Sequence, residues 1–343
     1  MIKTHVRGTP KLTMKSRLKV SIALCTYNGS DFLKQQLDSF LDQTLLPVEL
    51  VICDDGSTDD TMLIIEEFSA LAPFPVRLHI NSQNLGSTKN FEKAISLCTG
   101  DIIVLADQDD VWYSHKLQSI VEVFVLDDEV GMVFSDADIV DVNLKKMGYM
   151  LWQKYDFDRS KQKIIAKGNG FDVFIKNQYV TGATMAFRSS LIALLLPISS
   201  RWVHDGWISL LASAVTKVAV VAEPLIMYRQ HDGQQIGATR MSIVQKISSS
   251  SVKSSDYYQN LAWQYQDAFD RLNELAMVKD YCQQQKMQAK LNHLIARAKI
   301  NDLGFTGVPI IAKELLSQHY HHYSSGFVSM IKDLVGIGRR LLC

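Results

Sequence analysis

The chain has 343 residues, of which 47% are hydrophobic, and its 36 basic and 36 acidic side chains leave no net charge. This length and apolar content predict a large folded core and exclude a wholly disordered chain, while the balanced charge gives no general attraction to nucleic acid. The basic start of the sequence lacks the apolar segment of a secretory signal, and no apolar run reaches the ~18 residues that a membrane span requires.

Residues 1–18 are expected to form a flexible basic arm, and the following ninety or so residues alternate between two patterns. Short runs rich in β-branched residues have the character of buried strands, and the segments between them repeat apolar residues at helical spacing. Strands that alternate with helices in this way form parallel sheets with right-handed crossovers. The expected strands are 19–25, 48–52, 77–80 and 102–105, and the expected helices begin near Asp31, Met62 and Thr88.

The next segment is less regular, although it still mixes strands and helices. A helix is expected at 111–126 and a strand at 130–135, whereas 141–180 shows no clear periodicity. Further expectations are a strand at 185–187, a short helix at 189–196, a helix that opens at 202–207 and runs to about 214, and strands at 218–222 and 224–228.

The sequence after residue 241 has a helical pattern, so we divide the chain into an α/β domain at 19–240 and a helical extension at 241–343. A serine cluster at 248–255 is expected to be a linker. Residues 286–343 carry eight Lys and Arg against three Asp and Glu, an excess of five positive charges. Apolar residues recur at helical spacing within 327–341, which could lie on an anionic membrane leaflet or pack on the α/β domain.

Two acidic clusters, at 53–60 and 106–110, each follow a strongly apolar run. Ligands bind to open α/β sheets beyond the C-terminal ends of the strands, so both clusters are expected at the binding edge. A carboxylate that faces an anionic ligand needs a cation between them. The sequence therefore predicts a site for a nucleotide diphosphate that is bridged by a divalent metal.

Five motifs, each at a predicted strand end, carry a resemblance to a known family. Over about 18–235 the chain resembles the family 2 glycosyltransferases of GT-A fold, which implies a mixed, mostly parallel sheet flanked by helices. It is most similar to the rhamnosyltransferase-like members that assemble bacterial surface polysaccharides such as O-antigen, through 204–207 and 228–231. The motifs are CTYNG at 25–29, DDGSTD at 54–59, QNLG at 83–86, DQDD at 107–110 and HD at 204–205.

The resemblance implies an inverting transfer of a sugar from a nucleotide-diphosphate donor, with rhamnose as a candidate, to a surface glycan or a lipid-linked acceptor. Asp205 corresponds to the catalytic base that takes the acceptor's proton. Asp109 corresponds to a direct ligand of Mn²⁺ or Mg²⁺, ions that prefer carboxylate oxygens, and His231 is a second candidate ligand. The expected contacts to the donor are Thr26, Tyr27, Asn28, Asp54, Asp55, Gly86, Asp107 and Arg229, with Tyr27 and Asp55 at the base and Arg229 at the diphosphate.

Structural roles stay open for several of these residues. Asp55 and Asp205 could cap helices, Tyr27 could pack in a turn, and Arg229 and His231 could belong to a polar loop. The alternative function is a non-catalytic subunit that binds nucleotide sugar, although such a subunit needs no metal ligands. A nucleotidyltransferase is a weaker alternative, because such enzymes usually have a glycine-rich phosphate loop near the first strand.

The five cysteines include no Cys-x-x-Cys pair, so we expect buried free thiols in a cytoplasmic protein that could associate with the cytoplasmic face of the membrane. The expected partners are the nucleotide-sugar donor and the glycan or lipid-linked acceptor, and nucleic acid is not among them. The run HYHHY at 319–323 has no Cys or acidic neighbour in its pattern, and we expect a surface loop there rather than a metal site.

Overall fold

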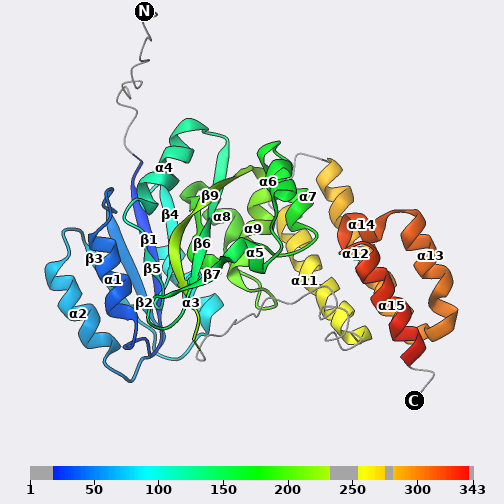
Figure 1. Ribbon diagram of the computed structural model, residues 1–343, viewed down its shortest axis with the longest axis horizontal. Coiled ribbons are helices and arrows are strands. Elements are labelled where there is room, and N and C mark those ends of the chain that lie inside the picture. The colour runs from blue at the N-terminus through cyan, green and yellow to red at the C-terminus, as the bar shows by residue number, and fades with distance from the viewer. Residues whose placement is uncertain (1–17, 232–253, 275–280, 340–343) are drawn as a thin grey trace, which may run out of the picture.

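The protein is described by a computed structural model that covers residues 18–231, 254–274 and 281–339. A nine-stranded mixed sheet with helices on both sides forms its centre, and the C-terminal helices stand apart at one end (Figure 1). The expected arm at 1–18 lies almost wholly outside the described residues, as does most of the expected linker at 248–255. The strand order is β3-β2-β1-β4-β8-β6-β9-β5, and β7 pairs with β6.

The first half of the sheet is parallel, as the sequence predicts. Strand β1 lies between β2 and β4 in this half. It pairs in register with both, so that Thr26 lies opposite Asp54 on β2 and Cys25 lies opposite Asp107 on β4. The ends of these strands therefore meet at one edge. The strands are β1 (Val20–Thr26), β2 (Glu49–Asp54), β3 (Val76–Ile80) and β4 (Ile102–Asp107), joined by α1 (Leu33–Leu41), α2 (Thr61–Leu71) and α3 (Ser87–Leu97).

The second half of the sheet is mixed. Strand β8 (Met185–Arg188) runs antiparallel to β4 and to β6 (Val130–Val140), and β6 is parallel to the long strand β9 (Lys217–Arg229). The expected continuous helix at 111–126 is wrong. Its first residues form β5 (Val111–Trp112), which pairs antiparallel with the end of β9, and α4 (Lys116–Leu126) starts only afterwards.

The segment at 141–180, which lacks a clear pattern in the sequence, is structured. Strand β7 pairs antiparallel with β6, and three short helices follow it across one end of the sheet. Their shortness explains why no helical period is visible, since the longest has eight residues. The elements are β7 (Lys146–Met150), α5 (Leu151–Lys154), α6 (Arg159–Ala166) and α7 (Gly170–Phe174).

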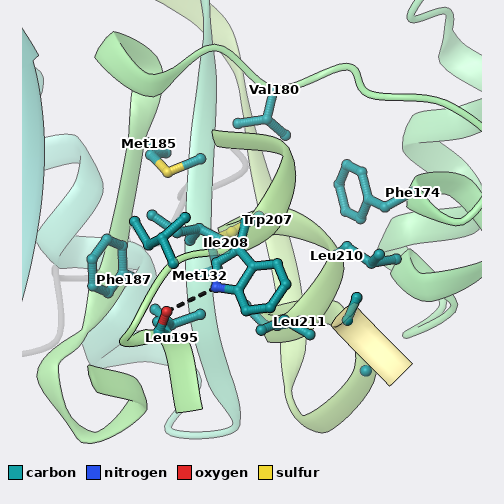
Figure 2. Close-up of a cluster of buried hydrophobic side chains, with 14 of the residues drawn as sticks. Met132, Phe174, Val180, Met185, Phe187, Leu195, Trp207, Ile208, Leu210 and Leu211 are labelled. Atoms are coloured by element: carbon teal, nitrogen blue, oxygen red, sulfur yellow. Dashed lines mark hydrogen bonds between the residues drawn. The ribbon is translucent and has the colours of Figure 1, made fainter. Parts of the chain in front are cut away.

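Helix α9 (His204–Val215) is buried along almost its whole length. Trp207 lies among apolar side chains from several elements and donates from Nε1 to the carbonyl oxygen of Leu195, 2.8 Å away (Figure 2). Trp202 likewise donates from its ring to the carbonyl oxygen of Gln264. Both tryptophans are therefore packing residues, and the first turn of α9 has a rigid support.

The described part of the C-terminal extension is helical, with α11 (Ser255–Glu274) between the sheet and the last helices (Figure 1). Helix α12 (Tyr281–Leu303) packs against α11 and carries Arg297, whose guanidinium binds Asp333 at 2.8 Å. Among the described residues, no helix is both long and apolar enough to cross a membrane. The remaining helices are α13 (Val308–Leu316), α14 (His319–Tyr323) and α15 (Phe327–Arg339).

Candidate active site

The turn after β2 is built on the carboxylate of Asp54, which is fully buried. One oxygen accepts hydrogen bonds from the hydroxyls of Thr26 and Ser57, and the other accepts from the backbone N–H groups of Gly56 and Ser57. Asp54 and Thr26 therefore hold the ends of β1 and β2 together. The expectation of a donor contact from the Asp54 carboxylate is wrong for this arrangement, because four protein donors already occupy it.

Asp55 links the same turn to the loop after β3. Its carboxylate, 3% exposed, accepts hydrogen bonds from Asn81 Nδ2 and from the backbone N–H groups of Leu85 and Gly86, at 2.7 to 2.8 Å. Gly86 has a φ of 77°, which suits glycine. Asp55 does not cap a helix here; it shapes the loop between β3 and α3. A direct contact with a base stays a prediction.

The loops after β1 and β4 are joined through Gln108, a residue the sequence did not single out. Its side-chain amide accepts from the backbone N–H of Tyr27 at 2.8 Å and donates to the Tyr27 carbonyl at 3.0 Å. The Tyr27 ring itself is 49% exposed, so it is not packed in the turn and its face is available for stacking. Asn28 follows in a left-handed conformation and fastens the turn to Ser57 and Thr58.

Asp109 and His231, the two predicted metal ligands, lie together. Asp109 Oδ2 is 2.8 Å from His231 Nε2, and the two side chains are 16% and 18% exposed. A carboxylate oxygen and an imidazole nitrogen at this separation in a partly open position fit the donor preferences of Mn²⁺. These two residues could therefore hold a divalent cation, which would replace the proton of their hydrogen bond.

Arg229 lies beneath this pair, and its predicted contact with the donor's diphosphate is wrong. Its side chain is fully buried over the ring of Phe32, and its guanidinium donates to the carbonyl oxygens of Asp109 and Val142 and to Gln35 Oε1. A guanidinium used in this way orients the loop at 108–110 from inside the protein. Because this loop carries Asp109, it is called the metal loop below. No sequence pattern distinguishes it from a surface arginine.

Two buried ionisable side chains, Asp110 and Lys116, lie beside Asp109 in the sequence or close to it in the fold. Asp110 accepts from the backbone N–H of Arg229 at 3.1 Å, whereas its Oδ2 has no hydrogen-bond partner among the described residues. Asp110 therefore does not cap a helix at Val111. Lys116, also fully buried, donates to the carbonyl oxygen of Ala183 at 2.6 Å, and burial lowers the pKa of its ammonium to about 7 although Asp110 and Asp107 oppose the change.

Asp205, the expected catalytic base, is in the first turn of α9 with only 7% of its surface exposed. Its Oδ1 accepts from the backbone N–H of Gly206 at 2.6 Å and from the side-chain amide of Gln178. Burial raises its pKa to about 6, against the effect of these donors. Asp205 is thus a shielded carboxylate that is still ionised at neutral pH.

Asp107 joins the two parts of the site. Burial, together with the charges of Asp109 and Asp205, raises the pKa of Asp107 to about 7, so both of these carboxylates lie within electrostatic range of Asp107. Next to the base, His204 is buried against Phe91, and neither ring nitrogen has a partner among the described residues. Burial lowers the pKa of His204 to about 4, so this ring is neutral near pH 7.

The structure therefore brings most of the predicted residues to one edge of the sheet. Asp109 contacts His231, the charges of Asp109 and Asp205 both act on Asp107, and Tyr27, Asn28 and Gly86 are on the loops that follow β1 and β3. The sequence missed Gln108, Gln178 and Lys116, which position this set. Only Gln108 had a signal in the sequence, since it is the middle residue of the Asp-x-Asp element.

This carboxylate-lined sheet edge, in a mixed and mostly parallel sheet, defines a GT-A glycosyltransferase. The model of the family described as glycosyl transferase family 2 matches residues 21–194. The chain therefore belongs to this family and is a glycosyltransferase.

Two relatives extend the match in sequence. An uncharacterized glycosyltransferase of Nostoc sp. is 29% identical over 71% of this chain and 75% of its own length. The dTDP-rhamnosyl transferase RfbG of Shigella flexneri is 26% identical over 63% of this chain and 74% of its own length.

Two solved structures of remote sequence share the fold. TarS of S. aureus in complex with UDP-GlcNAc superposes with a TM-score of 0.55 at 17% identity, covering 93% of this chain and 89% of that one. The mannosyltransferase PcManGT of Pyrobaculum calidifontis, in complex with GDP-Man and Mn²⁺, has a TM-score of 0.51 at 17% identity, covering 96% and 88%.

Proposed function

We propose that the enzyme transfers a sugar from a nucleotide-diphosphate donor with inversion at the anomeric carbon, that it requires a divalent metal, and that Asp205 is its base. The observations that carry this proposal are the shielded carboxylate of Asp205 and the Asp109–His231 pair, with Asp107 in electrostatic range of both Asp109 and Asp205. The first can activate an acceptor and the second can hold a diphosphate through a metal.

The roles of the protein groups follow from their surroundings. Asp205 removes the proton of the acceptor hydroxyl as its oxygen forms a bond to the sugar carbon, while the bond from that carbon to the diphosphate breaks. Gln178 and the N–H of Gly206 hold Asp205 Oδ1 and thereby orient the carboxylate. A divalent metal held by Asp109 and His231 would stabilise the charge on the departing diphosphate.

The donor and the acceptor are further parts of the proposal. We favour dTDP-rhamnose, because RfbG of Shigella flexneri, a dTDP-rhamnosyl transferase by name, matches over 63% of this chain. The acceptor would then be a growing surface glycan, O-antigen included, on a lipid carrier. For the metal we favour Mn²⁺ over Mg²⁺, since an imidazole ligand beside a carboxylate suits the softer ion better.

Peripheral contact with the cytoplasmic face of the membrane is also proposed, through α15. Phe327, Ile331, Leu334 and Val335 follow one another at helical spacing and are 39% to 58% exposed, whereas Ile337 packs inward. The basic excess of 286–343 would favour anionic lipid. Co-sedimentation with vesicles containing phosphatidylglycerol should succeed for the full chain and fail for the Ile331→Asp variant.

The experiment that tests the main proposal is a thermal-shift screen of nucleotide sugars with and without Mn²⁺, followed by an assay of nucleoside diphosphate release. A ligand that binds the folded state raises the melting temperature, so the true donor should stand out only when the metal is present. Binding without any release in the presence of acceptor glycans would favour the non-catalytic subunit. A shift that is the same in EDTA would contradict the metal requirement.

A further inference from the structure

A second group of metal-binding side chains lies in the C-terminal extension, well separated in sequence from the active site. It consists of His293 on α12, Glu314 on α13 and His319 on α14. Glu314 Oε2 is 2.5 Å from His293 Nδ1 and 3.0 Å from His319 Nδ1, and the three ligand atoms all lie within 4.8 Å of one another. The expected surface loop at 319–323 is wrong, since it is a helix with an acidic partner.

The burial of the three residues is graded. His293 has no exposed side-chain surface, Glu314 has 7% and His319 has 28%. An ion could therefore reach the group from the side of His319, while the other two ligands are fixed inside the helical bundle. A cation at this position could be reached from solvent, and it would exchange most of its hydration water for protein ligands.

The surroundings of His293 fix which ring nitrogen faces the group. Its Nε2 lies 2.8 Å from Ser324 Oγ, which also accepts a hydrogen bond from Arg297 Nη1 at 3.1 Å. Metal-bound histidines usually have their second nitrogen held by such a partner. The positive charge of Arg297 is already balanced, because its guanidinium donates twice to Asp333. The charge of buried Lys290 also reaches this ring, and its ammonium donates to the carbonyl oxygen of Tyr323.

We propose that His293 Nδ1, Glu314 Oε2 and His319 Nδ1 bind a Zn²⁺ ion, with water completing the coordination. Two imidazole nitrogens and one carboxylate oxygen form a donor set that Zn²⁺ commonly takes. In a tetrahedral zinc site, neighbouring ligand atoms are ~3.3 Å apart, given zinc–ligand distances of about 2.0 to 2.2 Å. Glu314 Oε2 must therefore withdraw slightly from both rings to admit the ion, which rotation about its side-chain bonds allows.

The proposed ion would act as a clamp, because its ligands come from three different helices. A small apolar cluster joins these three helices and α15, with Ile300, Ile311, Tyr320 and Ile337 at its centre. A metal joined to α12, α13 and α14 would hold this end of the protein together more firmly than the apolar contacts alone. The proposal does not depend on the function assigned to the active site.

The test measures Zn²⁺ bound to the full-length protein after dialysis, in the Asp109→Asn background so that the active site contributes less. We expect one fewer Zn²⁺ per chain in the His319→Ala variant than in the parent. His322→Ala is the matched control, since it removes an exposed histidine of the same helix. Co²⁺ in place of Zn²⁺ should give the visible absorption of a four-coordinate site in the parent and the control, but not in His319→Ala.

A second variant guards against a loss that comes from misfolding. Glu314→Gln keeps a hydrogen-bonding side chain of the same length but removes the charge, and it should also lose the ion. The melting temperature should rise on adding Zn²⁺ to the parent and to His322→Ala, and stay constant for the other two variants. Equal Zn²⁺ content in His319→Ala and His322→Ala would overturn the proposal and leave the group as a hydrogen-bonded His–Glu–His triad.

Discussion

Asp109 and His231 are 122 positions apart in the chain, yet Asp109 Oδ2 and His231 Nε2 are separated by only 2.8 Å. The two-residue strand β5 accounts for this proximity. It follows Asp110 directly and pairs antiparallel with β9, with Val111 opposite Met227. The residues that precede β5 are therefore brought beside those that end β9, and the carboxylate meets the imidazole.

The first prediction concerns this pair. Asp109→Asn should weaken donor binding in the presence of Mn²⁺ by about tenfold or more, equivalent to at least about 1.4 kcal/mol, because an amide oxygen is a poorer ligand than a carboxylate. Isothermal titration with the nucleoside diphosphate, in Mn²⁺ and in EDTA, measures the change. Asp38→Asn, at an exposed ion pair with Lys34, is the control and should bind like the parent. Equal affinities for both variants in Mn²⁺ would remove Asp109 as a ligand.

The second prediction concerns the base. Asp205→Asn should lower kcat by about 10²- to 10⁴-fold, the range for a lost general base, while the affinity for the donor stays close to that of the parent. In the parent enzyme, kcat/KM should fall as the pH drops below about 6, the raised pKa of Asp205. Nearby Asp107 interacts with the same charge and will broaden the profile. If Asp205→Asn had the kcat of the parent, a residue other than Asp205 would be the base.

The third prediction concerns stability at the same residue. The pKa of Asp205 is raised on folding from 3.8 to about 6, so the folded state holds the proton more tightly than the unfolded state. Ionisation therefore costs stability, in full above about pH 6, and the cost vanishes below about pH 4. Asp205→Asn should stabilise the protein by about 1 to 3 kcal/mol at pH 8 and hardly at all at pH 4. Urea unfolding at both pH values measures this, and equal effects at the two would refute it.

Much of the parallel half of the fold could be predicted from sequence, because its strands are continuous apolar runs that end in turn-forming residues. The segment after Asp110 could not. Val111 and Trp112 fit the pattern of the helix that follows, and only pairing with β9, more than a hundred residues later, makes them a strand. A pairing between residues so far apart in the chain produces no pattern in the sequence around either of them.

The candidate active site, like the fold, could be predicted from sequence only in part. Aspartates at strand ends marked the edge where Asp107 and Asp109 lie, but no pattern in the sequence separates the side chains that can meet a ligand from those that hold the surrounding loops. Asp54 and Arg229 have the chemistry of ligand contacts, and their side chains are instead satisfied inside the protein. Burial decides the role, and burial depends on the packing of the whole domain.

The fourth prediction tests the link between the loops of β1 and β4. A Cβ atom at Gly29 would lie 2.3 Å from Gln108 Oε1, so Gly29→Ala should displace the Gln108 side chain from the backbone of Tyr27 and weaken donor binding. Gln108→Ala alone should weaken it similarly. If the clash is the cause, the double variant should be no worse than Gln108→Ala, which makes the two effects strongly non-additive. Additive losses in titrations with nucleoside diphosphate would contradict the link.

The fifth prediction separates the positioning role of Arg229 from its contribution to stability. Arg229→Lys keeps the charge but loses the planar fork that reaches Asp109, Val142 and Gln35, and it should cost about 2 to 4 kcal/mol in urea unfolding.

The matched control for this fifth prediction is Arg188→Lys. Arg188 also donates to backbone carbonyl oxygens, those of Val130 and Phe124, but it contacts no residue of the metal loop. Both variants should lose stability, and only Arg229→Lys should also lose the Mn²⁺-dependent part of donor affinity, because only there is the carbonyl of Asp109 released. If donor binding by the two variants responded equally to Mn²⁺, Arg229 would be a packing residue and the orientation of Asp109 would depend on β5 alone.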